Sequence, residues 1–329
     1  MPPPLAPLRG WRYHIPEQGG TAVICGGLDI GGTKIEARLF DAALDTVATH
    51  RVPTPRDSAD AFFDALAGQV GWLQAQAGAP DLPVGIAMTG VVEPDSGIAQ
   101  TANLPISGQP MQDRLVARLG RRLPVMNDSM ALAFSEANGG AAEGSDAAVG
   151  LILGTGVAAG LCIAGAPAPR YGGIAVEIGH AGMPARALAR HGLPLWPCGC
   201  GREGCVETYV AGPGLTRLAQ HAGLGPLTAL QVVAAGAATE PVLAMWADLA
   251  AECLEMLQMT IDPRVVVLGG GLSQMPGVAQ RLTDALPARL MPGVPAPAIR
   301  VARFGDASGV RGAALLARRI AEGVLPWTP

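Results

Sequence analysis

Three cysteines lie close together in a glycine-rich segment that reads Cys-Gly-Cys-Gly-Arg-Glu-Gly-Cys, from Cys198 to Cys205. Three thiolates and one imidazole complete a tetrahedral zinc site and leave no open position for water, which is typical of a structural site. No fourth cysteine lies nearby, so His180 is the expected fourth ligand and His191 a weaker candidate. The spacing therefore predicts a structural zinc bound by His180, Cys198, Cys200 and Cys205, with a redox pair or thiols without a role as the alternative.

Two glycine turns, each after an apolar segment, have the composition of phosphate-binding hairpins. Glycine lets backbone N–H groups approach phosphate oxygens, and Thr33 and Thr155 add hydroxyl donors. Asp29 ends the first apolar segment, where its carboxylate can hold water on a nucleotide-bound Mg²⁺. Ordinary tight hairpins are the alternative, but a third glycine run follows residues 265–268, and the combination favours phosphate binding. The three segments are Asp29-Ile-Gly31-Gly32-Thr33, Gly154-Thr155-Gly156 and Gly269-Gly270-Gly271.

Asp128 stands between an apolar segment and a predicted helix, in the trio Asn127-Asp128-Ser129. Its side chain is placed to cap that helix, a common role of aspartate. Beside a phosphate site, a carboxylate at a strand end is also the group that phosphoryl transfer to an alcohol needs, because it accepts the hydroxyl proton. Both roles are compatible. A segment stiffened by zinc would likewise hold Glu177 and Glu207, which either bind sugar hydroxyls or are solvated surface charges.

Strands alternate with helices along the chain, which is the pattern of an α/β protein. Each of the two glycine turns joins two strands, and this repetition indicates a duplicated architecture. The polar residues above fall at the ends of these elements. The predicted strands are 23–28, 34–40, 84–88, 148–153, 157–163 and 265–268, and the predicted helices are 59–77, 111–119, 130–137, 243–261 and 312–321.

The composition points to a globular protein with a small-molecule partner. With 329 residues, of which 49% are apolar and 15% charged, the chain is long enough for two domains of ~150 residues. The formal charge of -4 is small and spread out, so no nucleic-acid or membrane surface is expected. The uncharged run 147–169 is long, but its glycines and prolines favour strands and turns. Residues 1–20 lack the apolar stretch of a signal peptide, so we expect a disordered tail on a cytoplasmic protein.

The motifs together resemble one family, the ROK family of repressors, open reading frames and kinases, from residue 22 to the C-terminus. The resemblance implies an α/β, actin-like ATPase (ribonuclease H-like) fold of two domains with an active-site cleft between them. The expected division is a disordered extension (1–21), a small domain (22–125 plus 312–329) and a large domain (126–311). The motifs that carry the resemblance are Asp-Ile-Gly-Gly-Thr at Asp29, Asn127-Asp128, Gly154-Thr155-Gly156, Glu177-Ile-Gly-His180 and the cysteine cluster with Glu207.

The resemblance also implies ATP-dependent phosphorylation of a sugar, with Mg²⁺, with Asp128 as the base and with a homodimer as the common assembly. Segments 51–58, 150–156, 191–195 and 267–273 are most similar to members that phosphorylate N-acetylglucosamine at its 6-hydroxyl. The implied sugar-binding residues are Asn103, Asn127, Asp128, Glu177, His180 and Glu207. The implied ATP-binding residues are Asp29, Gly31, Gly32, Thr33, Lys34, Gly154, Thr155, Gly156, Gly269, Gly270 and Gly271.

Several departures from the family pattern leave the preferred sugar and the turnover open. Fructokinases or mannokinases, glucokinases and N-acetylmannosamine kinases are the enzyme alternatives, and segment 303–315 fits fructokinase-like relatives almost as well. A sugar-responsive repressor is the non-enzyme alternative, disfavoured because residues 1–20 are too short for a DNA-binding helix pair. A zinc hydrolase is excluded because a closed zinc site has no position for water. The departures are Thr89 in place of a proline, Ser129 and Met130 after Asp128, and Ala158 and Ala159 in place of glycines.

Overall fold

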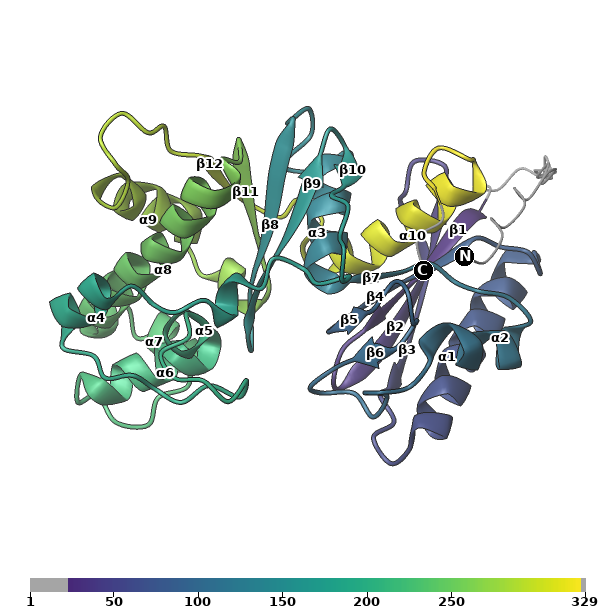
Figure 1. Cartoon of the computed structure of the whole chain (residues 1–329), viewed down its shortest axis with the longest axis horizontal. Coiled ribbons are helices and arrows are strands. Elements are labelled where there is room, and N and C mark those ends of the chain that lie inside the picture. Colours follow the sequence, from purple (N-terminus) through teal and green to yellow (C-terminus); the bar gives the residue numbers. More distant parts are fainter. Residues whose placement is uncertain (1–22, 327–329) are drawn as a thin grey trace.

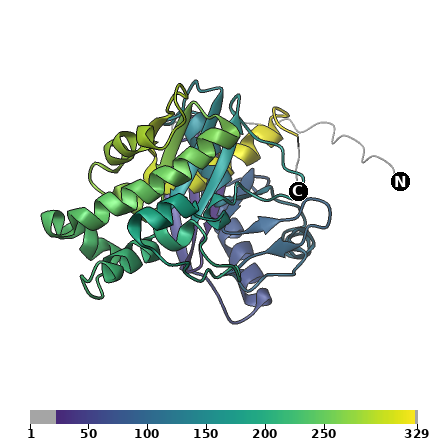
Figure 2. The same cartoon turned by 60° about the vertical axis from the view of Figure 1, so that its left-hand side comes forward.

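The computed structural model describes residues 23–326, in which two five-stranded sheets lie on either side of a pair of helices (Figure 1). Helix α3 (Asp128–Ala137) and helix α10 (Ser308–Ala321) form this pair and contact each other. Figure 2 shows the long helix α8 (Glu240–Ile261) on the side of the second sheet. The disordered extension predicted for residues 1–21 lies outside the described residues.

The first sheet has the strand order β3-β2-β1-β4-β7. Strand β1 pairs antiparallel with β2 and parallel with β4, which in turn pairs parallel with β7, so β1, β4 and β7 end at the same edge. Helix α1 covers one face through buried Phe62 and Phe63, and it begins at Ser58, whose hydroxyl accepts a hydrogen bond from Ala61 N–H. The elements of this half are β1 (Val23–Ile30), β2 (Lys34–Asp41), β3 (Thr46–Pro53), α1 (Ala59–Ala77), β4 (Val84–Met88), β5 (Val91–Val92), β6 (Ala99–Gln100), α2 (Met111–Leu119) and β7 (Val125–Asn127).

The second sheet has the strand order β10-β9-β8-β11-β12. Strand β8 pairs antiparallel with β9 and parallel with β11. Its core includes the fully buried Trp246 of α8, whose indole N–H donates a hydrogen bond to the Val210 carbonyl at 2.8 Å. The elements of this half are β8 (Ala147–Leu153), β9 (Val157–Ile163), β10 (Ala166–Pro167), α4 (Ala185–His191), α5 (Glu207–Val210), α6 (Gly212–His221), α7 (Ala229–Ala234), α8, β11 (Val265–Gly269), α9 (Val278–Ala285) and β12 (Ala298–Val301). Five 3₁₀ turns complete the described chain: η1 (Ile178–His180), η2 (Gly236–Thr239), η3 (Gly271–Gln274), η4 (Leu286–Ala288) and η5 (Gly305–Ala307).

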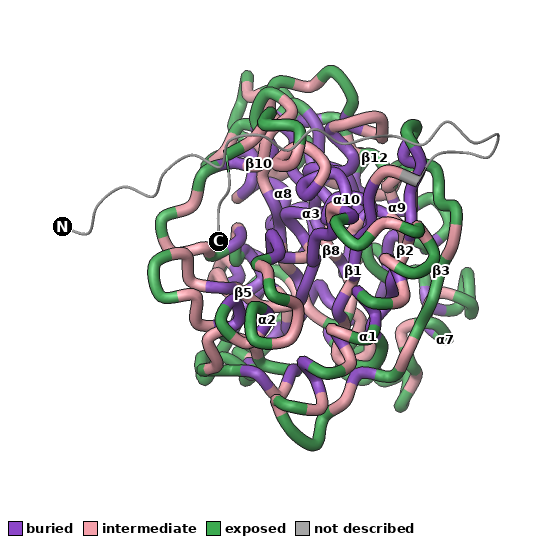
Figure 3. Tube along the Cα trace, turned by 90° about the vertical axis from the view of Figure 1, so that its right-hand side faces the viewer, coloured by how far each residue is buried: buried purple, intermediate pink, exposed green. Residues whose placement is uncertain are grey.

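The two sheets repeat one plan, a hairpin followed by a parallel strand, and each packs on one of the two central helices. Helix α10 contacts β1 and β4, and α3 contacts β8 and β9. The packing is close enough to require glycine: a Cβ at Gly85 would lie 2.0 Å from the Ala313 carbonyl oxygen, and one at Gly160 would lie 2.1 Å from that of Ser129. Figure 3 shows buried residues gathered along α3, α10, β1 and β8.

The predicted elements are confirmed, with starts that differ by a few residues. Helices α3, α8 and α10 begin at Asp128, Glu240 and Ser308, each before the predicted start. The uncharged run 147–169 forms strands β8, β9 and β10, as predicted, and none of the helices among residues 23–326 is long and apolar enough to cross a membrane. The domain boundary predicted after residue 125 falls inside β7; the division itself stays a prediction.

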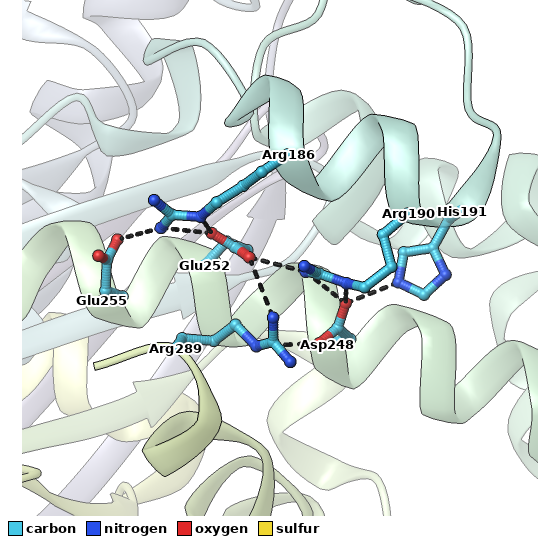
Figure 4. Close-up of polar contacts among 7 residues, drawn as sticks. All are labelled: Arg186, Arg190, His191, Asp248, Glu252, Glu255 and Arg289. Atoms are coloured by element: carbon cyan, nitrogen blue, oxygen red, sulfur yellow. Dashed lines mark hydrogen bonds and ion pairs between the residues drawn. The ribbon is translucent and has the colours of Figure 1, made fainter. Parts of the chain in front are cut away.

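A network of ion pairs holds α4 on α8 (Figure 4). Glu252 of α8 has a fully buried side chain and pairs with Arg186 at 2.8 Å and with Arg190 at 2.7 Å. Asp248, one turn earlier, binds Arg190 and the imidazole of His191, whose Nε2 lies 2.6 Å from the carboxylate. Because α4 lies between His180 and Cys198 in sequence, this network anchors the segment that leads to the cysteine cluster. It also occupies His191, the weaker zinc candidate.

Candidate active site

The first glycine turn joins β1 to β2, and residues that follow β3 bind its carbonyl groups. The Gly31 carbonyl accepts a hydrogen bond from the Thr54 hydroxyl at 2.7 Å, and the Gly32 carbonyl accepts one from Arg56 Nε at 2.9 Å. The Thr33 carbonyl accepts a hydrogen bond from Thr54 N–H at 3.0 Å. A turn anchored through its carbonyls keeps its shape when its N–H groups bind an anion.

The second glycine turn shares a cavity of about 980 Å³ with the glycine run after β11. Gly154, Thr155 and Gly271 all line this cavity. The rest of its wall comes mainly from α6, α7 and η3, and includes the apolar residues Leu227, Leu230, Val233, Leu272 and Met275. A cavity lined by a glycine turn and by apolar residues has the composition expected for a nucleotide, whose phosphates are charged and whose base is flat and largely apolar.

Gly269 and Gly270 have a packing role, and their predicted contact with the nucleotide stays a prediction. A Cβ at Gly269 would lie 2.7 Å from a methyl group of Leu132, and one at Gly270 would lie 2.7 Å from the Leu153 carbonyl oxygen. Gly270 also has a φ of 80°, a conformation that side chains disfavour. These two glycines bring the end of β11 against the second hairpin, and of this run it is Gly271 that lines the cavity.

Asp128 is the first residue of α3, directly after β7. The cap of this helix is Asn127, whose side-chain oxygen accepts a hydrogen bond from Ser129 N–H at 2.9 Å while its amide donates to the Gly90 carbonyl. Asp128 Oδ1 accepts a second hydrogen bond from the same N–H at 2.8 Å. Burial raises the pKa of Asp128 to about 6. The hydrogen bond from Ser129 N–H lowers this pKa, and the negative charge of Glu177 raises it. The group is therefore a carboxylate that is basic enough to take a proton near neutral pH.

Asp29 lies at the end of β1, at the same edge of the sheet as Asp128. Burial raises the pKa of Asp29 to about 7, and the charge of Asp128 is the next largest cause. A carboxylate whose proton affinity is raised by a second carboxylate in this way lies where a divalent cation is favourable. The N-terminal turn of α10 comes close to the same group, since a Cβ at Gly309 would lie 3.7 Å from the Asp29 carboxylate.

The residues implied to bind the sugar fall into two groups. Glu177, His180 and Glu207 interact with one another: the His180 Nδ1 atom lies 3.6 Å from Glu207 Oε1, and the charges of both residues act on Glu177. Burial raises the pKa of Glu177, while the nearby His180 and Arg170 lower it. Asn103 belongs to the other group, next to the first glycine turn, with its Cβ 3.5 Å from the position of a Cβ at Gly32. Asn127, as the α3 cap, has both side-chain groups engaged.

The predicted zinc ligands converge. One ligand atom from each of His180, Cys198, Cys200 and Cys205 lies within 4.8 Å of the other three. The sulfur atoms of Cys200 and Cys205 are 3.6 Å apart, and Cys198 Sγ is 3.6 Å from His180 Nδ1. These separations suit a tetrahedral ion with bonds of ~2.0–2.3 Å, so the residues fit zinc. Hydrogen bonds from Arg202 lower the pKa of Cys200 to about 6, which favours the thiolate, whereas burial raises that of Cys198.

Two arginines near the site were missed by the sequence reasoning, and one predicted lysine is engaged elsewhere. Arg56 binds the first glycine turn, and Arg170 lies close enough to Glu177 to affect its pKa. Lys34, predicted to bind ATP, pairs with the buried Glu36 at 3.2 Å. Neither arginine lies in a glycine or carboxylate motif, although Arg56 falls in the segment 51–58 that carried part of the family resemblance.

The repeated hairpin-and-strand plan, with a glycine turn in each half, is that of the actin-like ATPase fold with two domains, and the predicted fold class is confirmed. The sequence pattern described as the ROK family matches residues 25–320. The chain therefore belongs to the ROK family, as the motifs around Asp29 and Asp128 predicted.

Three similar proteins define its place in the family. An N-acetyl-D-glucosamine kinase from Escherichia coli is 42% identical over 301 residues, which cover 88% of this chain and 98% of that enzyme. The crystal structure of a ROK hexokinase from Thermus thermophilus has a TM-score of 0.78 at 31% identity, covering 91% of this chain and 99% of the other. A ROK family glucokinase from Streptomyces griseus, in complex with glucose and AMPPNP, has a TM-score of 0.75 at 28% identity over 90% of this chain and 99% of that chain.

Proposed function

We propose that this protein is an ATP-dependent sugar kinase that phosphorylates N-acetyl-D-glucosamine at its 6-hydroxyl, producing N-acetylglucosamine 6-phosphate and ADP. The observation that carries the proposal is Asp128, a carboxylate with a pKa raised to about 6 at the same sheet edge as Asp29. The similarity to the Escherichia coli enzyme, which extends over 98% of that enzyme, supports the choice of sugar.

In the proposed reaction Asp128 accepts the proton of the 6-hydroxyl as its oxygen attacks the γ-phosphorus of ATP. The new oxygen–phosphorus bond forms while the bond to the β-phosphate oxygen breaks, and ADP leaves. The capping role of Asn127 supports this assignment, because α3 has a cap without the Asp128 side chain. The proton taken by Asp128 passes to solvent before the next turnover.

ATP and Mg²⁺ would use the two glycine turns and Asp29. We place the phosphates between the first turn, at Gly31 to Thr33, and the second turn, at Gly154 to Gly156, with the adenosine in the cavity beside Gly271. Asp29 would hold water on the Mg²⁺. When bound, the ion would supply positive charge that offsets the negative phosphate oxygens, and Asp29, whose pKa is raised by burial and by Asp128, would face it as a carboxylate.

The sugar would be bound by Asn103, Glu177, His180 and Glu207 around Asp128. A second cavity of about 340 Å³ borders Asn127 and is lined by Gly90, Met130 and Arg170, among others. An acetamido group needs an apolar contact for its methyl and polar partners for its amide, and this cavity offers both kinds of group. The unusual Met130 then becomes part of the preference for an N-acetyl sugar.

Zinc would have a structural role in this enzyme. The four ligands His180, Cys198, Cys200 and Cys205 leave no position for water, so zinc would not take part in the chemistry. Glu207 follows the ligand Cys205 by two residues, and Glu177 precedes the ligand His180 by three. The metal would therefore hold the backbone next to both carboxylates for sugar binding. A cytoplasmic homodimer without nucleic-acid or membrane partners is the context that we expect.

A coupled assay of ADP release with a panel of sugars tests the proposal. N-acetylglucosamine should give the highest kcat/KM among N-acetylglucosamine, glucose, mannose, N-acetylmannosamine and fructose. A site built for an amide discriminates because its buried polar groups lose their partners when the amide is absent. A clear preference for fructose or mannose would contradict the assigned sugar and leave the kinase class in place. Absence of ADP release with every sugar would contradict the kinase itself.

A further inference from the structure

Arg56 holds the first glycine turn through a forked contact. Its Nε and Nη2 atoms both donate hydrogen bonds to the Gly32 carbonyl, at 2.9 Å and 2.5 Å. A guanidinium group has five N–H donors in one plane, so this contact leaves further donors available on an exposed side chain. The turn fixes the orientation of the guanidinium group. It does not neutralise the positive charge of the group, because a carbonyl is neutral.

The other cations on β2 and β3 near this turn share one carboxylate partner. Lys34, Arg38 and Arg51 all pair with the buried carboxylate of Glu36. Arg56 makes no contact with a carboxylate among residues 23–326. A guanidinium stays charged at every physiological pH. Arg56 therefore brings a positive charge without a carboxylate partner to the turn where we place the phosphates of ATP.

Arg56 lies near residues that we assign to each of the two expected substrates. Its Nη2 atom and the Cβ of Asn103 each lie 3.5 Å from where a Cβ of Gly32 would be. Gly32 belongs to the turn assigned to ATP, and Asn103 is assigned to the sugar. A charged group beside both residues lies where the phosphate donor and the hydroxyl acceptor come together.

We propose that Arg56 is a catalytic residue that donates hydrogen bonds to the γ-phosphoryl group as it passes from ATP to the sugar. This inference rests on the proposed kinase function. As the bond to the β-phosphate oxygen breaks and the bond to the sugar oxygen forms, negative charge is spread over the three outer oxygens of the phosphoryl group. A guanidinium already oriented by Gly32 stabilises that charge without reorganisation. The contact strengthens in the transition state, so its loss lowers kcat more than it weakens ATP binding.

The test compares the Arg56→Ala and Arg56→Lys variants with the wild type, using N-acetylglucosamine and ATP. We expect Arg56→Ala to reduce kcat by about 10²-fold, a usual effect of removing one oriented donor, with the Kd for ATP changed by less than about 10-fold. Arg56→Lys keeps the charge but loses the forked contact, so its kcat should lie between those of Arg56→Ala and the wild type. Free guanidinium ion added to Arg56→Ala should restore part of kcat, an effect that a purely structural role would not produce.

Arg51→Gln is the matched control, because Arg51 is an exposed arginine of the same hairpin that pairs with Glu36. It should keep kcat and show no response to guanidinium ion. An unchanged kcat in Arg56→Ala would overturn the inference, and so would a loss of ATP affinity as large as the loss in kcat/KM. If Arg56→Ala folds poorly, Arg56→Lys provides the test. A kcat equal to that of the wild type would show that the forked contact is not required and would overturn the inference. A wild type without kinase activity would instead contradict the proposed function.

Discussion

Two neighbouring residues have different roles at the start of α3. Asn127 caps the helix with its side-chain oxygen, and the following Asp128 keeps a carboxylate with a pKa raised by burial. An aspartate that served only as a cap would be stabilised as an anion by N–H groups, and its pKa would be low. The raised pKa is the property that separates a proton acceptor from a structural aspartate.

The Asp128→Asn variant should bind ATP and sugar nearly as well as the wild type while kcat falls by ~10²–10⁴-fold, the effect of removing a general base. The amide keeps the size of the side chain and can still accept the hydrogen bond from Ser129 N–H. Titration calorimetry gives the two affinities and a coupled assay gives kcat. A variant with near wild-type turnover would reduce Asp128 to a structural residue.

The acid side of the pH profile should report the same carboxylate. Because Asp128 must be ionised to accept a proton and its pKa is about 6, kcat/KM for the sugar should rise with pH up to that value and level off above it. The effect on stability has the opposite sign: a raised pKa favours the folded protein at low pH, and this contribution is lost as pH rises through about 6. Activity that is constant from acid to neutral pH would contradict the assignment.

Thr89, which replaces a proline usual in the family, has a hydroxyl oxygen that is buried without a hydrogen-bond partner. Removing such a group removes its desolvation penalty, so Thr89→Val should raise the free energy of unfolding by about 1 kcal/mol. Thr239→Val is the control, because the Thr239 hydroxyl donates a hydrogen bond to the Val232 carbonyl at 2.6 Å and its loss should destabilise the protein. Urea unfolding measures both. Equal destabilisation of the two variants would show that Thr89 is hydrogen-bonded in solution.

At the level of elements, the cysteine segment from Cys198 to Cys205 lies between α4 and α5, and Glu207 is the first residue of α5. Wild-type protein should contain about one zinc ion per chain, and Cys200→Ser should lose both the metal and thermal stability, because structural zinc contributes folding free energy. Metal analysis and thermal melts provide the two measurements. As a control, Cys253→Ala removes a buried cysteine outside the cluster, so it should lower the Tm and keep the zinc. Protein purified without chelators that contains no zinc would refute the site.

The contact between α4 and α8 depends on the carboxylate of Glu252. We expect Glu252→Gln to lower the free energy of unfolding by about 1–3 kcal/mol, because Arg186 and Arg190 lose charge-assisted hydrogen bonds to a buried group. Glu240→Gln is the matched control on the same helix, since Glu240 forms an exposed pair with Arg281 and should cost less than about 1 kcal/mol. Denaturant unfolding of the wild type and both variants measures the two losses in the free energy of unfolding. A loss as small as that of the control would mean that the network contributes little.

Elements and motifs that depend on neighbouring residues were predictable, and partners distant in sequence were not. The hairpins at Gly31 and Gly154 follow from glycine turns between apolar strands, and the cysteine cluster follows from its spacing. The sequence does not show that Glu36 would attract Lys34, because a strand pattern does not tell which charges are buried. Nor does it show that Gly269 and Gly270 serve helix and strand packing, since that role depends on Leu132 and Leu153.

For the whole molecule, the C-terminal segment joins the two halves. Helix α10 lies on β1 and β4 of the first sheet and contacts α3, which belongs with the second sheet. Glu136 of α3 is fully buried and accepts hydrogen bonds from the Ser308 hydroxyl at 2.6 Å and from the backbone N–H of Arg303 at 3.0 Å. The inner face of the first sheet is thus completed by residues from the other end of the chain.

This arrangement has a consequence for the nascent chain on the ribosome. Strand β1 is the first of the described strands to emerge, whereas α10, which covers it, is the last of the described helices. At a synthesis rate of ~5–20 residues per second, the inner face of β1 and β4 stays uncovered for roughly a quarter of a minute to a minute before α10 is made. That face is built from glycines and small apolar residues such as Gly27, Gly85 and Ala87. The first sheet can therefore complete its folding only once α10 has been synthesised, and until then its uncovered face is a surface that chaperones can bind.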